Sequence, residues 1–131
     1  MSLAAKQSPR VEARWRFIFR AANNYATALG DLQRFEQVRS LLRKTIPVAR
    51  RALGEEHRLT LKMRVTYAMA FCRDASTTLD DLRGAIKSLE DSERTVRRVL
   101  GGAHPFTVQI ERFLRMSRAV LAARETPSRS K

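Results

Sequence analysis

One short phrase occurs twice in this chain, and it sets the scale of any fold that the chain can adopt. "LGEEHRLT" at 53–60 and "LGGAHPFT" at 100–107 share Leu, Gly, His and Thr at identical offsets, 47 residues apart. His57 and His104 are the chain's two histidines, and they take equivalent places in the two copies. Two interpretations are open: a pair of histidines placed for chemistry, or the borders of an internal repeat.

The spacing of apolar residues predicts an all-α protein. Apolar side chains recur every three or four positions, and they never alternate with polar ones over a long run, so strands are not expected. The chain holds 5 Gly and 4 Pro, which favours long regular elements with few tight turns. We expect five helices, at about 9–29, 34–53, 58–73, 79–100 and 105–124.

Residues that favour helix ends stand at the borders of these segments. Ser8 before Pro9 is typical of a helix start. Gly54 and the Gly101–Gly102 pair are expected to end the second and fourth helices, because a left-handed conformation costs Gly little. His57 and His104 would then cap the third and fifth helices. The fourth helix begins after "RDASTT", where Thr77 or Thr78 can cap it.

Two interruptions are predicted in the first two helices. Pro47 lies inside the second helix, and a proline there removes a hydrogen bond and usually kinks the chain. Gly30–Asp31 is expected to break the first helix.

The apolar spacing also predicts which residues point inward. We expect Tyr67 in the core, and Val99 and Val120 to point inward on the fourth and fifth helices. The predicted inward stripe of the first helix is Val11, Trp15, Ile18, Ala22, Tyr25, Ala26 and Leu29.

Two internal shifts relate one half of the chain to the other. A shift of 42 residues places "NNYATAL" at 23–29 on "VTYAMAF" at 65–71, and a shift of 47 places the second helix on the fourth. The extra five residues fall between 72 and 82. The unit is therefore a helix–turn–helix of about 42 residues, a period that is typical of a helical solenoid. Because the loops are short, neighbouring helices should pack antiparallel.

The segments "NNYATAL", "RFEQVRSLLRK" and "LGEEHRLTL" together resemble the kinesin light chain type of tetratricopeptide repeat over roughly 18–121. The resemblance implies a right-handed solenoid of about two and a half repeats. Three features depart from the family pattern. Gln33 and Phe35 stand where the family has Gly and Tyr, Val65–Thr66 replace the paired Asn, and the third copy stops after its first helix.

The expected organisation is a single helical domain with short ends. Residues 1–8 are a flexible N-terminus in this scheme, and 125–131 are a flexible basic tail. The domain 9–124 divides into repeat one at 9–54, repeat two at 57–101 and a capping helix at 105–124. "MSLAAKQSPRVEARWRF" is loosely similar to an organelle transit peptide, although it also suits the first turns of a helix.

Cysteine content and hydropathy limit the cellular locations that we expect for this chain. Cys72 is the chain's one cysteine, so no intramolecular disulfide can form, and we expect a cytoplasmic protein. The longest apolar run, "YAMAFC" at 67–72, falls far short of the roughly 18 residues that a membrane span needs. No membrane span is expected.

The chain has a formal net charge of +13, carried unevenly. Residues 74–93 hold 2 basic and 6 acidic residues, whereas the segments on either side are strongly basic. Most of the basic residues are Arg, whose planar fork suits carboxylates and phosphates. GC-rich coding is a plainer cause of the same composition.

The sequence offers little for catalysis, and we expect no enzyme, no metal site and no cofactor. In a repeat, His57 and His104 are separated by a whole helix pair, and a metal site needs three or four convergent ligands. No phosphate-cradling glycine loop and no Gly-x-Ser-x-Gly motif is present. "DD" at 80–81 and "EDSE" at 90–93 suit an acidic first helical turn and a solvated face better than a carboxylate pair.

Binding is the favoured function. In the resembled architecture the first helix of each repeat lines a concave groove, and the family uses an Asn at the position of Asn23 to hold a peptide backbone. Positive charge along this groove predicts a protein or peptide partner with acidic residues. Asp31 is expected to face the groove as well. The expected groove residues are Arg20, Asn23, Asn24, Thr27, Lys62, Val65, Met69, Arg73, Gln109, Arg112 and Met116.

Two other kinds of partner stay open. The surface of the fifth helix or the free edge of the first could dock on another copy, giving a homo-oligomer. Alternatively, the chain could be a nucleic-acid (RNA) binding helical-repeat protein that uses its Arg-rich surface. No exposed aromatic residue is expected among the arginines, which argues against RNA.

Overall fold

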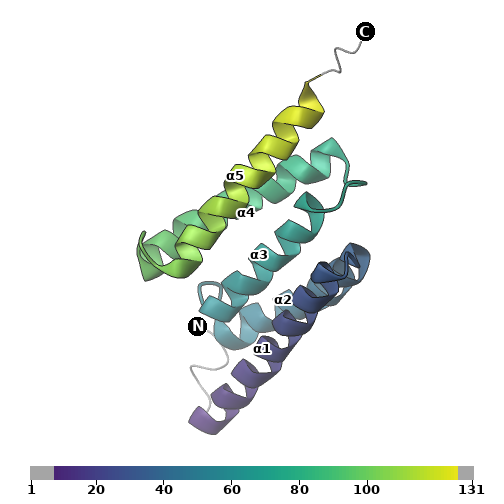
Figure 1. The fold of residues 1–131 in the computed structure, drawn as a ribbon. Coiled ribbons are helices and arrows are strands. Elements are labelled where there is room, and N and C mark those ends of the chain that lie inside the picture. Colours follow the sequence, from purple (N-terminus) through teal and green to yellow (C-terminus); the bar gives the residue numbers. More distant parts are fainter. Residues whose placement is uncertain (1–7, 127–131) are drawn as a thin grey trace.

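A computed structural model describes residues 8–126 and contains, in that range, five α-helices and no strand (Figure 1). The prediction of an all-α protein is confirmed. Residues 1–7 and 127–131, where a flexible start, a transit-like segment and most of a basic tail were expected, lie outside the described residues. The helices are α1 (Pro9–Asp31), α2 (Phe35–Leu53), α3 (Arg58–Cys72), α4 (Leu79–Leu100) and α5 (Pro105–Glu125).

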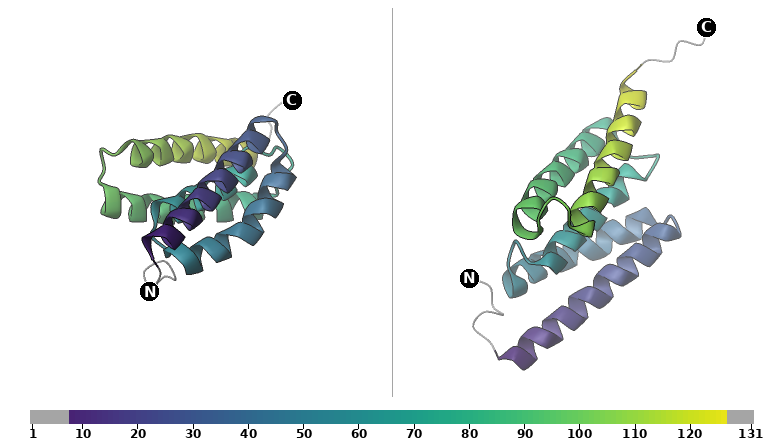
Figure 2. Two further views of the ribbon diagram at one scale, coloured as in Figure 1. Left: turned by 90° about the horizontal axis from the view of Figure 1, so that it is seen from below. Right: turned by 60° about the vertical axis from the view of Figure 1, so that its left-hand side comes forward.

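The helices are arranged around α3. Each helix packs on the next along the chain, and α3 also packs on α1 and on α5. Consequently α1, α3 and α5 lie side by side, with α2 and α4 behind them (Figures 1 and 2). Because α3 contacts all four other helices, most of its circumference is buried.

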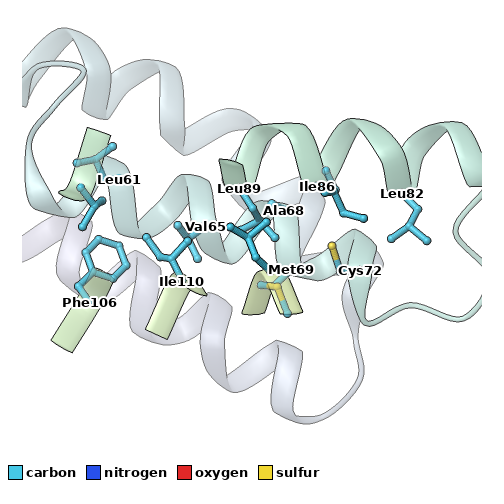
Figure 3. Packing of buried hydrophobic residues seen from close by; sticks show 13 residues of the cluster. Leu61, Val65, Ala68, Met69, Cys72, Leu82, Ile86, Leu89, Phe106 and Ile110 are labelled. Carbon is cyan, nitrogen blue, oxygen red and sulfur yellow. The ribbon is translucent and has the colours of Figure 1, made fainter. Parts of the chain in front are cut away.

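Two hydrophobic clusters share α3. The first joins α1 and α2 to one side of α3, with Phe19, Leu42 and Met63 almost completely buried. The second joins the opposite side of α3 to α4 and α5, around Leu89 and Ile110 (Figure 3). A helix between two clusters needs apolar residues on both sides, which leaves α3 only a narrow polar stripe that includes Lys62 and Thr66.

The predicted helix starts are confirmed by hydrogen bonds. The Ser8 hydroxyl accepts from the Val11 amide at 3.3 Å. Thr78, rather than Thr77, caps α4 by accepting from the Asp81 amide at 3.1 Å. His57 and His104 cap α3 and α5, each accepting through Nδ1 from the amide two residues on, at 3.1 and 3.0 Å. The repeated histidines therefore mark helix starts.

The two repeated glycines end helices as predicted. Gly54 has φ 106° and Gly101 has φ 98°, and both have ψ near 155°. Residues with a Cβ rarely adopt this combination. Gln33, in the α1–α2 turn, also has a positive φ of 62°, at a place where the resembled family has Gly.

The predicted helix borders agree with the structure to within two residues, but the two predicted interruptions are absent. α1 continues through Gly30 to Asp31, and the amides of Leu32, Gln33 and Arg34 then donate to its last carbonyls. α2 passes through Pro47 without interruption, with the proline exposed and the helix missing only the hydrogen bond that its nitrogen cannot donate. α3 ends at Cys72, and α5 extends to Glu125.

The buried face of α1 also differs from the prediction. Phe19 is 2% exposed, whereas Ile18 and Tyr25, both predicted inward, are 45% and 60% exposed. Trp15 is half-buried and stacks on Phe19, with ring centroids 5.5 Å apart. The face that packs on α2 and α3 therefore runs from Trp15 through Phe19 to Ala26 and Leu29, in steps of four, seven and three residues that keep to one side of the helix.

Two valines predicted to point inward are largely exposed. Val99 is 44% exposed because the inner stripe of α4 passes from Val96 to Leu100. Val120 is 41% exposed because the fully buried residues of α5 end at Ser117. None of the described helices is long and apolar enough to cross a membrane.

Candidate functional site

A groove of about 560 Å³ follows the layer formed by α1, α3 and α5. Two residues of α2, Phe35 and Val38, lie beneath it. Its lining mixes apolar and polar side chains, as sites that bind extended ligands require. The groove is lined by Asn23, Ala26, Thr27, Gly30, Asp31, Phe35, Val38, Lys62, Val65, Thr66, Met69, Ala70, Arg73, Phe106, Gln109, Phe113 and Met116.

An amide is held in place at the junction of α1 and α3. The Thr66 hydroxyl lies 2.9 Å from Asn23 Oδ1, to which it can donate, and also 2.9 Å from the Lys62 carbonyl oxygen. Among the described residues, nothing accepts a hydrogen bond from Asn23 Nδ2. The contact with Thr66 thus orients Asn23 and leaves its two amide protons available to an acceptor in the groove.

The floor of the groove is apolar and packed. Val65 and Met69 line it but are only 3% and 7% exposed, so they form its base rather than project into it. The Ser117 hydroxyl lies 3.9 Å from Met69 Sδ. Met116, by contrast, is 53% exposed and stands on the α5 wall.

One end of the groove carries a cation that is already engaged. Arg73 Cζ lies 5.4 Å from the centre of the Phe35 ring. Its Nη1 lies 3.9 Å from Asp31 Oδ1. Since Asp31 and Arg73 largely offset each other, this end offers little net charge to a ligand.

The other end opens into a strongly basic depression of about 540 Å³ between the first turns of α3 and α5. Arg58, Lys62 and Arg112 line it, none of them has an ion-pair partner among the described residues, and no carboxylate lines it. Lys62 Nζ also lies 5.9 Å from the centre of the Phe106 ring. Lys62, Phe106 and Gln109 line both hollows, so the depression and the groove adjoin each other.

Ion pairs account for the acidic segment seen in the sequence. Asp74 binds Arg39 at 3.1 Å, Asp80 lies 3.3 Å from Arg83, and Glu90 lies 2.8 Å from Arg118. Asp91 and Glu93 pair with Arg94 and Arg97. Most carboxylates of residues 74–93 are thus neutralised by other arginines. They therefore do not neutralise the cations around the basic depression.

The structure brings most of the predicted groove residues together. Asn23, Thr27, Lys62, Val65, Met69, Arg73, Gln109 and Met116 line the groove, and Arg112 lines the basic depression. Arg20 and Asn24 are exposed but line neither hollow. For Asn24 the reason is helical geometry, since one residue turns the side chain about 100° away from Asn23.

Sequence reasoning missed several contributors to this site, among them Arg58, Thr66 and Phe113. Arg58 lies one helical turn before Lys62, and the four-residue spacing could have placed both on one face. Thr66 was treated only as a departure from the resembled pattern, and Phe113 was not singled out for the groove. Their contacts depend on the pairing of α3 with α1 and α5.

Potential metal ligands and the cysteine thiol bear on the reactive chemistry of the described residues. Among them, no group of three or more His, Cys, Asp or Glu side chains could hold a metal ion. Cys72 is buried, and burial raises the pKa of its thiol. A high pKa keeps the thiol protonated and unreactive at neutral pH.

Acid is expected to destabilise the protein through His57. Burial, and next the positive charge of Arg16, lower the pKa of His57 below its ordinary value near 6.5; Glu12 acts in the opposite direction and Arg58 in the same. As the pH falls below 6.5, the unfolded chain therefore binds a proton that the folded chain resists, and stability decreases until the lower folded pKa is passed. Protonation also removes the Nδ1 acceptor of the α3 cap.

Urea unfolding at pH 8 and pH 5 checks this expectation. His57→Asn is the matched control, because Asn caps helices but does not titrate in this range. We expect a smaller loss of stability in acid for His57→Asn than for the wild type. An equal loss in the two proteins would place the acid sensitivity elsewhere.

Comparisons of the chain with protein-family models, with curated proteins and with solved structures give no significant match. The case for a function therefore depends on the groove, its oriented amide and its unpaired cations.

Proposed function

We propose that the chain is a non-catalytic protein-interaction module that binds an acidic peptide segment along the groove between α1, α3 and α5. The observation that carries the proposal is that this groove adjoins a depression where Arg58, Lys62 and Arg112 lack ion-pair partners among the described residues. An extended chain can lie over the apolar floor while its carboxylates meet these cations. We further propose that the five helices form a short, right-handed solenoid of the tetratricopeptide type, with α3 packed between the two ends.

The polar groups of the groove suit a peptide backbone. Asn23 and Gln109 present amides from opposite walls, and each amide carries both donors and an acceptor. Met69 and Met116 supply adaptable apolar contacts. Only three helices form the walls and floor of most of the groove, so it is short. We therefore expect modest affinity in the absence of further contacts.

Charge reversal at the basic depression is expected to weaken peptide binding. A fluorescein-labelled Glu-rich peptide, titrated with the protein and followed by fluorescence anisotropy, should bind more tightly than its Gln-substituted counterpart. Lys62→Glu and Arg112→Glu should each raise the dissociation constant by about tenfold, since each replaces an attraction by a repulsion.

Lys44→Glu provides the matched control, because Lys44 is an exposed cation on α2 with no ion-pair partner among the described residues. It changes the net charge equally but lies outside both hollows. Equal weakening by Lys44→Glu and Lys62→Glu would indicate a nonspecific charge effect and contradict the proposed site.

One observation favours RNA as a second candidate ligand. Contrary to the sequence expectation, α1 exposes aromatic rings among its arginines: Phe17 is 70% exposed and Tyr25 is 60% exposed, near Arg14 and Arg20. Exposed rings beside cations can stack bases of a single strand. Tight, sequence-dependent binding of a single-stranded RNA oligonucleotide at near-physiological salt would rank this function above peptide binding.

A further inference from the structure

α1 carries a second apolar face, which none of the described residues covers. Phe17, Ile18, Tyr25 and Leu32 are 70%, 45%, 60% and 64% exposed. With Ala21 and Ala28 between them, they form a stripe about 100° wide, which is the width of a normal helix-packing face. The polar residues of α1 are therefore confined to the remaining side of the helix.

The internal repeat identifies what this stripe is built for. The 42-residue shift that superposes α1 on α3 places Phe17 on Leu59, Ala21 on Met63, and Ala28 on Ala70. These three residues of α3 are 7%, 0% and 3% exposed and belong to the cluster formed with α1 and α2. The face that α3 buries against α1 and α2 is therefore exposed on α1. Its apolar residues are of the kind that pack between helices.

The charges of α1 favour one orientation for a second α1 that covers the stripe. The first half of α1 carries four arginines and one acid, whereas residues 21–30 carry no charge and Asp31 follows them. A parallel second α1 would set the arginines of the two helices against each other. An antiparallel one sets the basic half of each helix against the uncharged half of the other. The four arginines are Arg10, Arg14, Arg16 and Arg20.

We propose that two copies of this chain associate through α1 in an antiparallel pair, with the two-fold axis at Ala21. In this register Phe17 of one copy lies opposite Tyr25 of the other, twice, and the small side chain of Ala21 lets the helices approach. The interface is isologous, so it closes on a dimer. A single helix pair is a small interface, and the dimer is weak and reversible.

Sedimentation equilibrium of the full chain over a wide concentration range tests the dimer. We expect a monomer–dimer equilibrium, with a dimer dissociation constant raised at least about tenfold by Phe17→Arg or Tyr25→Arg, as for other central aromatic residues of interfaces. Both side chains are exposed in the single chain, and circular dichroism checks that each variant folds. Val99→Arg is the control, an exposed apolar residue on α4. A monomer at every concentration, or equal effects of all three substitutions, would overturn the proposal.

Disulfide cross-linking tests the direction of the pair. Ala21→Cys should link to itself, and a mixture of Phe17→Cys with Tyr25→Cys should form mixed dimers, whereas Phe17→Cys alone should not link. The native Cys72 is buried and does not compete. Linkage of Phe17→Cys to itself would indicate a parallel pair and overturn the proposed arrangement. Failure of both Ala21→Cys and the mixture to form links would overturn the pair itself.

Discussion

Phe19→Ala is expected to lower the free energy of unfolding by about 3–5 kcal/mol, the usual cost of removing a buried phenylalanine ring. Phe19 is 2% exposed and lies in the cluster that joins α1 and α2 to α3. Its ring stacks on Trp15, with the two ring planes 8° from parallel. Truncation would remove this contact and leave a cavity where α1 meets its neighbours.

Phe17→Ala is the matched control for this change. It removes the same ring two residues earlier on the same helix, where 70% of the residue is exposed, and we expect a change within about 0.5 kcal/mol. Urea unfolding of both variants at low protein concentration, followed by circular dichroism, gives the comparison. If Phe17→Ala destabilised the chain as much as Phe19→Ala, the assigned orientation of α1 would be wrong.

Gly101→Ala is expected to cost about 1–3 kcal/mol through backbone strain alone. Gly101 ends α4 with φ 98° and ψ 155°, a conformation that a side chain disfavours. A Cβ at this position would meet no heavy atom within 4 Å. Steric contact with neighbours therefore cannot explain a loss, and the measured value reports the backbone conformation directly.

Gly84→Ala separates this effect from the general consequences of replacing glycine. Gly84 lies inside α4, is exposed, and likewise has open space where a Cβ would go. Alanine favours a helix interior over glycine by up to about 1 kcal/mol, so we expect a gain in stability. Thermal unfolding of the two variants should shift the midpoint in opposite directions. A shift in the same direction would contradict the assigned ends of α4.

The helices could be predicted because their signals are local. An apolar spacing of three and four residues, a capping Ser, Thr or His, and a terminal Gly each act within a few residues of the chain. The repeated phrase was decisive, since it identified His57 and His104 as equivalent helix starts before their Nδ1 atoms were seen to accept amide hydrogen bonds.

The burial of α1 could not be predicted in the same way. α1 is apolar on two faces, so its sequence pattern alone does not say which face packs on α2 and α3. Phe19 and Ile18 lie only one residue apart, and the contact with Trp15 and the first cluster decides between them. Tyr25 was misplaced for the same reason, because its equivalent Tyr67 packs against the cluster while Tyr25 does not.

The charged part of the site depended on contacts between helices. Sequence spacing placed Lys62, Arg73 and Arg112 near one groove, but it could not tell which of them would be neutralised. Arg73 meets Asp31 and Phe35, residues of α1 and α2. Lys62 and Arg112 have no such carboxylate within reach among the described residues, and Arg58 adds to them. Ion pairing across helices therefore moves the available charge to one end of the groove.

A titration of isotope-labelled protein with the Glu-rich peptide, followed by amide chemical shifts, tests the proposed groove most directly. The account predicts shifts concentrated at Asn23, Lys62, Thr66 and Gln109 and around Arg112, with little effect on α2 beyond Phe35 and Val38. Shifts confined to the outer stripe of α1 or to the part of α2 outside the groove, or no saturable shifts at all, would contradict the assignment of the groove as the binding site.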